Sequence, residues 1–306
     1  MKNSVKILGL IALITTSSLF IFSSKNNEVE FSKNVNDSLK STSKTYEIKA
    51  LKIPDYLEFA GERVPLENTD IKEKIDRELL VNTYWQSNGL LMFKRANKYF
   101  PIIEPILKKN GIPDDFKYLA VIESGLLNIT SPAGAKGFWQ IMSSTAKEHG
   151  LEVNSNVDER YHLEKATQVA CDYLNDAKQQ FGNWTLAAAS YNAGKAGISN
   201  KIETQLVNDY YSLLLGDETE RYIPRIVAVK EIMTHPSKYG FIFNEEDLYT
   251  LEPTNIIEVD TAITDIARFS KNLGINYKTM KLHNPWLREN KLNNSSRKLY
   301  QIKIPK

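Results

Sequence analysis

One glutamate in this sequence has the type and position expected of a residue that does acid–base chemistry. Pro113, with two aspartates directly after it, is typical of a helix start. Phe116, Leu119, Ala120 and Glu123 then follow at i, i+3, i+4 and i+7, which places them on one helix face. Because an ionised carboxylate is costly on an apolar face, we predict that the pKa of Glu123 is raised.

The residues after Glu123 predict a loop that faces this acid. Gly125 is positioned to end the helix, and residues 131–137 are mostly small. The loop then delivers Phe138, Trp139 and Gln140 ahead of the next helix. A partly desolvated acid opposite aromatic and amide groups suits a general acid beside a sugar-binding wall. A glutamate on such a face is also often a helix-end residue that reaches solvent, so periodicity leaves both interpretations open.

Four ordered motifs resemble the soluble lytic transglycosylase (SLT) domain, over roughly residues 85–243. They are Glu123-Ser124-Gly125, then SPAGAKGFWQIM at residues 131–142, ASYNAG at 189–194 and ETERY at 218–222. The second motif departs from the family pattern, because Phe138-Trp139 stands where Leu-Met is commoner. The spacing of 17 from Glu123 to Gln140 is also one residue shorter than usual.

The resemblance implies a glycan-cleaving mechanism with one carboxylate. Glu123 would protonate the glycosidic oxygen between N-acetylmuramic acid and N-acetylglucosamine, and would then take a proton from the C6 hydroxyl that attacks C1. The product is a 1,6-anhydro sugar, and the enzyme is a carbon–oxygen lyase acting on peptidoglycan. Such an acid needs a pKa of roughly 6. The resemblance also implies a set of substrate-binding residues: Ser124, Ser131, Trp139, Gln140, Tyr191, Asn192 and Tyr222.

Some of these assignments have structural alternatives. Ser124 could bind backbone instead of substrate. Trp139 and Phe138 could stack on a sugar or fill the core, and we expect core for one of them. Gln140 has an amide suited to an N-acetyl group.

Two other functions remain open at this point. A goose-type lysozyme hydrolase shares the fold and the glutamate, but glycoside hydrolysis normally needs a second carboxylate. The other acids considered share no motif with Glu123, namely Asp114, Asp115, Glu148, Glu152 and Asp158. The third function is a peptidoglycan-binding protein without turnover, which the complete motif set disfavours.

Composition excludes several classes of protein and partner. The chain has 306 residues, 42% hydrophobic and 25% charged, and a net charge of +2, which is too balanced for nucleic-acid binding. Four scattered histidines give no metal-site spacing, and we expect no cofactor. Cys171 is the single cysteine, so no intramolecular disulfide forms, and we interpret it as a buried small hydrophobe. We expect a monomer whose partner is the glycan strand.

The N-terminal residues indicate export. Residues 1–24 have the pattern of a signal peptide or signal anchor, and residues 5–22 would provide any inner-membrane anchoring. With no cysteine near residue 20, the protein is not a lipoprotein, and we expect a periplasmic or envelope location. Residues 25–70 predict a flexible tether and a strap that follows it.

Patterning after the strap predicts two domains. Residues 71–245 predict a mainly α domain of lysozyme-like type, with Pro101 and Pro105 interrupting one helical stretch. Residues 246–306 predict strand, helix, helix, strand and resemble the LysM carbohydrate-binding module. We expect the Asn284–Leu287 turn to expose Trp286 to glycan; the alternative is that Trp286 packs on the helical domain and the module is a brace.

Overall fold

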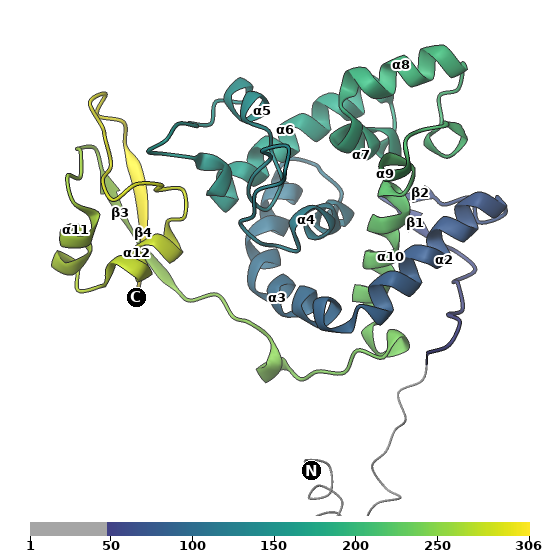
Figure 1. The fold of residues 1–306 in the computed structure, drawn as a ribbon, viewed down its shortest axis with the longest axis horizontal. Helices are drawn as coiled ribbons and strands as arrows, with labels where there is room; N and C mark the ends of the chain where they lie inside the picture. Colours follow the sequence, from purple (N-terminus) through teal and green to yellow (C-terminus); the bar gives the residue numbers. More distant parts are fainter. Residues whose placement is uncertain (1–47) are drawn as a thin grey trace, which may run out of the picture. The chain divides into compact units, whose positions relative to one another are not determined.

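The computed structural model describes residues 48–306. The predicted signal segment and most of the tether therefore lie outside the described residues. The part of the chain from residue 69 to residue 234 is helical, and its elements surround the short helix α4 (Figure 1). The α-helices of this part are α2 (Thr69–Tyr84), α3 (Gln86–Lys109), α4 (Lys117–Ser124), α5 (Ser143–Glu148), α6 (Leu163–Phe181), α7 (Trp184–Ala193), α8 (Lys195–Gln205), α9 (Asp217–Glu220) and α10 (Tyr222–Thr234).

The packing of these helices brings α4 and α10 together. Helix α10 contacts α2, α4 and α7, while α3 contacts α4 and α6. Short 3-10 turns complete the connections: η1 (Asp114–Phe116), η2 (Glu159–Tyr161), η3 (Tyr210–Ser212), η4 (Pro236–Tyr239) and η5 (Glu245–Asp247). The expected mainly α class is confirmed.

Helix α3 corrects one expectation. It runs unbroken through Pro101 and Pro105, which we had expected to interrupt it. A proline inside a helix costs about 3 kcal/mol through a lost hydrogen bond and a steric clash. Met92, Ile103 and Leu107 are buried along the same helix, and burial of such side chains offsets that cost.

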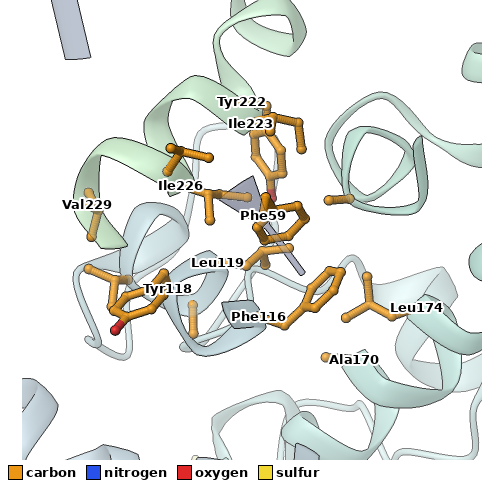
Figure 2. Packing of buried hydrophobic residues seen from close by; sticks show 14 of the residues in the cluster. Phe59, Phe116, Tyr118, Leu119, Ala170, Leu174, Tyr222, Ile223, Ile226 and Val229 are labelled. Carbon is orange, nitrogen blue, oxygen red and sulfur yellow. The ribbon is translucent and has the colours of Figure 1, made fainter. Parts of the chain in front are cut away.

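A strap precedes α2 and inserts into the core. Strands β1 (Glu58–Phe59) and β2 (Glu62–Arg63) form an antiparallel pair. Phe59 is fully buried between η1 and α10, in ring contact with Phe116 at 5.0 Å between centroids (Figure 2). The strap is also held by Asp115, whose carboxylate accepts from the Ala60 amide at 2.7 Å and from Lys230 at 2.7 Å.

The C-terminal module has the predicted order of elements. Strand β3 (Thr254–Val259) pairs antiparallel with β4 (Tyr300–Pro305), and α11 (Ile266–Asn272) and α12 (Tyr277–His283) lie between them in sequence. In the pairing register Ile257 lies opposite Ile302. The predicted strand, helix, helix, strand order is confirmed.

Trp286 is buried, which contradicts the expectation that it is exposed to glycan. It is 3% exposed and stacks on Tyr300 with 5.5 Å between ring centroids. The reason is Asn284, which is fully buried and exchanges two hydrogen bonds with the backbone of Lys303, at 2.7 and 2.8 Å. These bonds hold the turn against β4 and direct Trp286 inward, as the brace alternative requires.

Across residues 48–306, none of the helices combines the length and the apolar character needed to cross a bilayer.

Candidate active site

Glu123 lies at the last turn of α4, where the sequence predicted it. Helix α4 ends at Gly125, which has φ +59° and therefore sits in the left-handed region that glycine tolerates. Arg95 fixes this end by donating to the Gly125 carbonyl at 3.1 Å. Leu119 and Ala120, one turn earlier on the same helix, are fully buried, and Glu123 itself is half-buried.

The hydroxyl of Tyr222 on α10 donates a hydrogen bond to Oε1 of Glu123. Tyr222 is 1% exposed, and burial raises its phenol pKa well above the ordinary value, so it remains a donor at any physiological pH. The two residues are 99 positions apart in sequence. The contact between α4 and α10 therefore brings the first and fourth motifs together.

Burial raises the pKa of Glu123 to about 7, against an ordinary value of 4.5. The Tyr222 hydrogen bond lowers the pKa, the nearby Glu218 carboxylate raises it, and the Arg225 guanidinium lowers it. The predicted upward shift is confirmed. A carboxyl group with a pKa near neutrality can give up a proton and take one back during a single reaction cycle.

Glu218 is a second carboxylate near Glu123 that our sequence reasoning did not assign to the site. It is exposed on α9 and accepts from the side chain of Asn192 at 3.4 Å. Glu218 is the first residue of the fourth motif, so the motif itself could have indicated it as a site residue.

Glu78 on α2 is also absent from the predicted site. It is 1% exposed, accepts from Arg221 at 2.7 Å and lies 3.9 Å from the Nε of Arg225. It thus partly neutralises the cations at the start of α10, one of which acts on Glu123. No local sequence pattern marks it, because 143 residues separate it from Arg221.

Residues 129–141 form a tightly folded loop opposite α4. Lys136 and Ile141 exchange backbone hydrogen bonds at 3.1 Å, and the Gly137 amide donates to the Ile129 carbonyl at 3.0 Å. Gln140 has φ +46°, an uncommon backbone conformation for a residue other than glycine. Its Nε2 donates to the Gly137 carbonyl at 2.7 Å, which holds the amide at the loop surface.

Ser131 braces the same loop. Its Oγ accepts from the Ala135 amide at 3.0 Å. This bond gives Ser131 a role inside the loop, while the sequence predicted a contact with substrate.

Two of the predicted substrate-binding residues are turned into the protein. Trp139 is fully buried and its Nε1 donates to Thr167 Oγ1 on α6 at 2.8 Å, so it fills the core and does not stack on a sugar. Ser124 is also buried, and its hydroxyl donates to the Phe138 carbonyl at 2.8 Å. Phe138 is 4% exposed and meets Tyr99 edge to face. Trp139 and Phe138 point inward because of the path that the 129–141 loop takes, and the sequence does not reveal this path.

Tyr191 lies near enough to Glu123 to interact with its charge, and Tyr191 and Asn192 both line a cavity of about 200 Å³. The Tyr191 hydroxyl donates to the Trp139 carbonyl at 2.7 Å, and Asn192 Oδ1 accepts from Thr219 at 2.7 Å. Gln140 reaches the same cavity from the loop. The structure thus brings Glu123, Tyr222, Gln140, Tyr191 and Asn192 together from four separate segments.

Within the described residues, no group of three His, Cys, Asp or Glu side chains is arranged to hold a metal ion. The site combines a carboxyl group whose pKa is raised to about 7 with a cavity that is mostly apolar and carries a few polar groups.

Two family models match parts of this chain. Residues 100–212 match the family model of the transglycosylase SLT domain, and residues 255–306 match that of the soluble lytic transglycosylase C-terminal LysM-like domain. The chain thus carries an SLT domain followed by a LysM-like domain, as the motifs predicted.

The curated relatives are membrane-bound lytic murein transglycosylases. The chain is 30% identical over 195 residues to membrane-bound lytic murein transglycosylase D of Escherichia coli strain K12 and, equally, to that of strain O6:H1. The match takes in 61% of this chain but 42% of the relative, so the chain spans less than half of the proteins that it matches.

Two solved structures show weaker likeness. The 70 kDa soluble lytic transglycosylase of Escherichia coli matches 47% of this chain and 25% of its own, with a TM-score of 0.40 and 23% identity. An inactive mutant of lytic transglycosylase Slt from Pseudomonas aeruginosa matches 50% of this chain and 26% of its own, with a TM-score of 0.36 and 19% identity.

Proposed function

We propose that this protein is a peptidoglycan lytic transglycosylase in which Glu123 is both the general acid and the general base. The observation that carries the proposal is the half-buried Glu123 carboxyl group, with its pKa raised to about 7 and its Oε1 bonded to Tyr222. The SLT match and the transglycosylase relatives support the same reaction class.

The proposed reaction begins with Glu123 protonated. Tyr222 occupies Oε1, so the proton is transferred from Oε2 to the glycosidic oxygen as the bond from that oxygen to C1 breaks. The resulting carboxylate keeps the Tyr222 hydrogen bond, which stabilises its charge. It then accepts the C6 hydroxyl proton while that oxygen bonds to C1, which gives the 1,6-anhydro end and restores the acid.

We assign sugar recognition to the cavity that contains Gln140, Tyr191 and Asn192. The side-chain amide oxygens of Gln140 and Asn192 can accept from the N–H of an N-acetyl substituent, whereas the Gln140 nitrogen already donates to the Gly137 and Ile129 carbonyls. Tyr191 supplies an aromatic wall and, through its bond to the Trp139 carbonyl, ties the loop to α7. Trp139 and Ser124 are not part of this surface, since both are used inside the protein.

A goose-type hydrolase is a second candidate because Glu218 lies near enough to raise the pKa of Glu123. A hydrolase needs a carboxylate that activates water, and Glu218 is exposed and acidic. A lytic transglycosylase needs no such base, because the substrate hydroxyl is the nucleophile.

Digestion of purified murein with mass spectrometry of the products distinguishes these functions. We expect anhydro-muramic ends from the wild-type protein and from Glu218→Gln. Products with reducing ends, lost in Glu218→Gln, would establish the hydrolase. Binding to murein without any cleavage would establish a non-catalytic binding protein.

We also propose a cellular location for this activity. The relatives are described as membrane-bound, and residues 1–24 have an export pattern, so we place the protein in the cell envelope. Localisation of the full-length chain, with and without residues 1–24, checks this directly. The domain limits at 71–245 and 246–306 and the monomeric state stay predictions.

A further inference from the structure

The C-terminal module docks on residues 152–164, a segment that follows α5 and includes the first two residues of α6. Asn156 is the centre of this junction and is 6% exposed. Its side chain donates to the Lys291 carbonyl and accepts from the Asn293 amide, both at 2.8 Å, and its carbonyl accepts from the Arg288 amide at 2.9 Å. A single side chain of the helical domain thus satisfies backbone groups of two module residues.

The junction also has its own apolar core. Val157 and Tyr161 belong to the same buried cluster as Trp286 and Leu287 of the module. The Asp158 amide donates to the Trp286 carbonyl at 3.0 Å, beside the bridge between Val157 and Leu287. Because these groups are buried, the module and this segment exclude water from one shared interior.

The same short segment holds the 129–141 loop. Arg160 is 4% exposed, and its guanidinium donates to the Gly134 carbonyl at 3.1 Å and to the Ile141 carbonyl at 3.3 Å. Asp158 holds Arg160 in place through hydrogen bonds at 2.9 and 2.8 Å. Arg160 therefore spans the loop just before and just after the stretch that carries Gln140.

Backbone packing makes this contact tight. A Cβ added at Gly137 would lie 2.1 Å from the Arg160 carbonyl oxygen, so only glycine fits there. The Tyr161 hydroxyl also bonds Thr130 Oγ1 at 3.0 Å. Since Gln140 is hydrogen-bonded to the Gly137 carbonyl, a displacement of Arg160 would move the amide in the cavity.

We propose that Arg160 is a positioning residue through which the docked C-terminal module sets the geometry of the 129–141 loop. The path runs from the module turn at residues 286–293 through Asn156 and Asp158 to Arg160, and from there to Gly137 and Gln140. The module is then a brace for the substrate-binding loop. This inference rests on the proposed function for its catalytic consequence, while the structural coupling is independent of it.

The test uses the full chain and two asparagines. Asn156→Ala removes side-chain bonds across the junction, whereas Asn276→Ala removes bonds made only within the module, to Thr279. We expect amide hydrogen exchange of residues 128–142 to become roughly fivefold faster in Asn156→Ala and to stay unchanged in Asn276→Ala. We also expect kcat for release of anhydro ends to fall by roughly fivefold in Asn156→Ala alone, with a smaller change in KM.

A second pair of variants covers the case in which Asn156→Ala does not fold. Lys298→Ala breaks ion pairs across the junction with Glu152 and Glu159, and Arg297→Ala breaks an exposed pair with Asp260 inside the module. Faster loop exchange in Lys298→Ala but not in Arg297→Ala supports the proposal. Equal loop exchange within each pair would overturn it, leaving the module as a stabilising appendage. Because exchange is measured without substrate, a wild-type protein with no lytic activity would remove the proposed function and leave the coupling test valid.

Discussion

The candidate active site and the module junction both desolvate carboxyl groups, but the two regions shift the pKa values of these groups in opposite directions. At Glu123 burial dominates, and the pKa rises to about 7. At Asp158 burial also acts upward, but hydrogen bonds and charge from Arg160, together with the charge of Lys136, hold the pKa below its ordinary value. At Glu164 burial is likewise outweighed, by His162 and Lys303, and the pKa falls to about 2.

This difference shows what each region is built to do. A desolvated acid bonded to a neutral donor has a raised pKa and can exchange its proton near neutral pH. A desolvated acid bonded to a guanidinium or ammonium group is ionised and serves as a fixed attachment point. Desolvation thus accompanies a reactive group in one place and a structural one in the other, and the bonded partner decides which.

The largest expected effect is the loss of activity in Glu123→Gln. The amide has the shape of the acid but can neither donate nor accept the proton in the cycle, so kcat should fall by roughly 10²–10⁴-fold. Release of anhydro-muropeptides from purified murein measures this. Circular dichroism should be unchanged, and near-normal turnover would remove Glu123 from its proposed role.

Asp158→Asn should reduce the stability of the fold. It leaves the buried Arg160 guanidinium without its counter-charge, at a cost of about 3–5 kcal/mol in the free energy of unfolding. Urea denaturation at pH 7 measures the loss. The control is Asp70→Asn, whose exposed ion pair with Lys74 should be worth less than about 1 kcal/mol. Equal losses in the two variants would contradict the assigned role of Asp158.

The pH dependence of stability sharpens the comparison further. Because the folded pKa of Glu123 is about 7 and the unfolded one is near 4.5, folding binds a proton between these values. Its contribution is fully present below pH 4.5 and is lost as the pH rises to about 7, a change of about 3 kcal/mol. The free energy of unfolding of Glu123→Gln, relative to wild type, should therefore increase by that amount between pH 4.5 and 8. A constant difference across that range would mean that the acid is not desolvated.

Tyr222→Phe should have the smallest effect of the four. Loss of the hydroxyl removes a hydrogen bond that lowers the pKa of Glu123, so the alkaline limb of the kcat/KM profile should move to higher pH. We expect the maximal rate to fall by roughly tenfold, because the carboxylate formed after proton transfer loses a donor. Tyr239→Phe is the matched control, since Tyr239 donates to Glu231 away from the site at 2.9 Å. An unshifted pH profile in Tyr222→Phe would mean that Tyr222 does not lower the pKa of Glu123.

Sequence periodicity predicted the features that depend on local structure. The helix of Glu123, its end at Gly125 and the upward pKa shift all follow from neighbouring residues. The directions of Ser124 and Trp139 could not be predicted, because they depend on how the 129–141 loop folds onto α6.

Long-range partners were equally invisible. Glu78 meets Arg221 across 143 residues, and Asn156 meets Asn293 across 137, and neither pair belongs to a shared motif. Asn284 likewise forms hydrogen bonds with the backbone of Lys303 in β4, and these bonds turn Trp286 inward. Such pairs depend on the assembled fold, so a single sequence shows the residues and not their partners.

The buried strap imposes an order on the synthesis of this protein. Phe59 can be buried only after α4 and α10 exist, and the partner of Glu58, Lys230, lies 172 residues downstream. The strap leaves the ribosome before these helices and is therefore packed late, since such distant contacts cannot form until the later helices are made. Until then Phe59 is exposed, and a chaperone has a segment that it can bind.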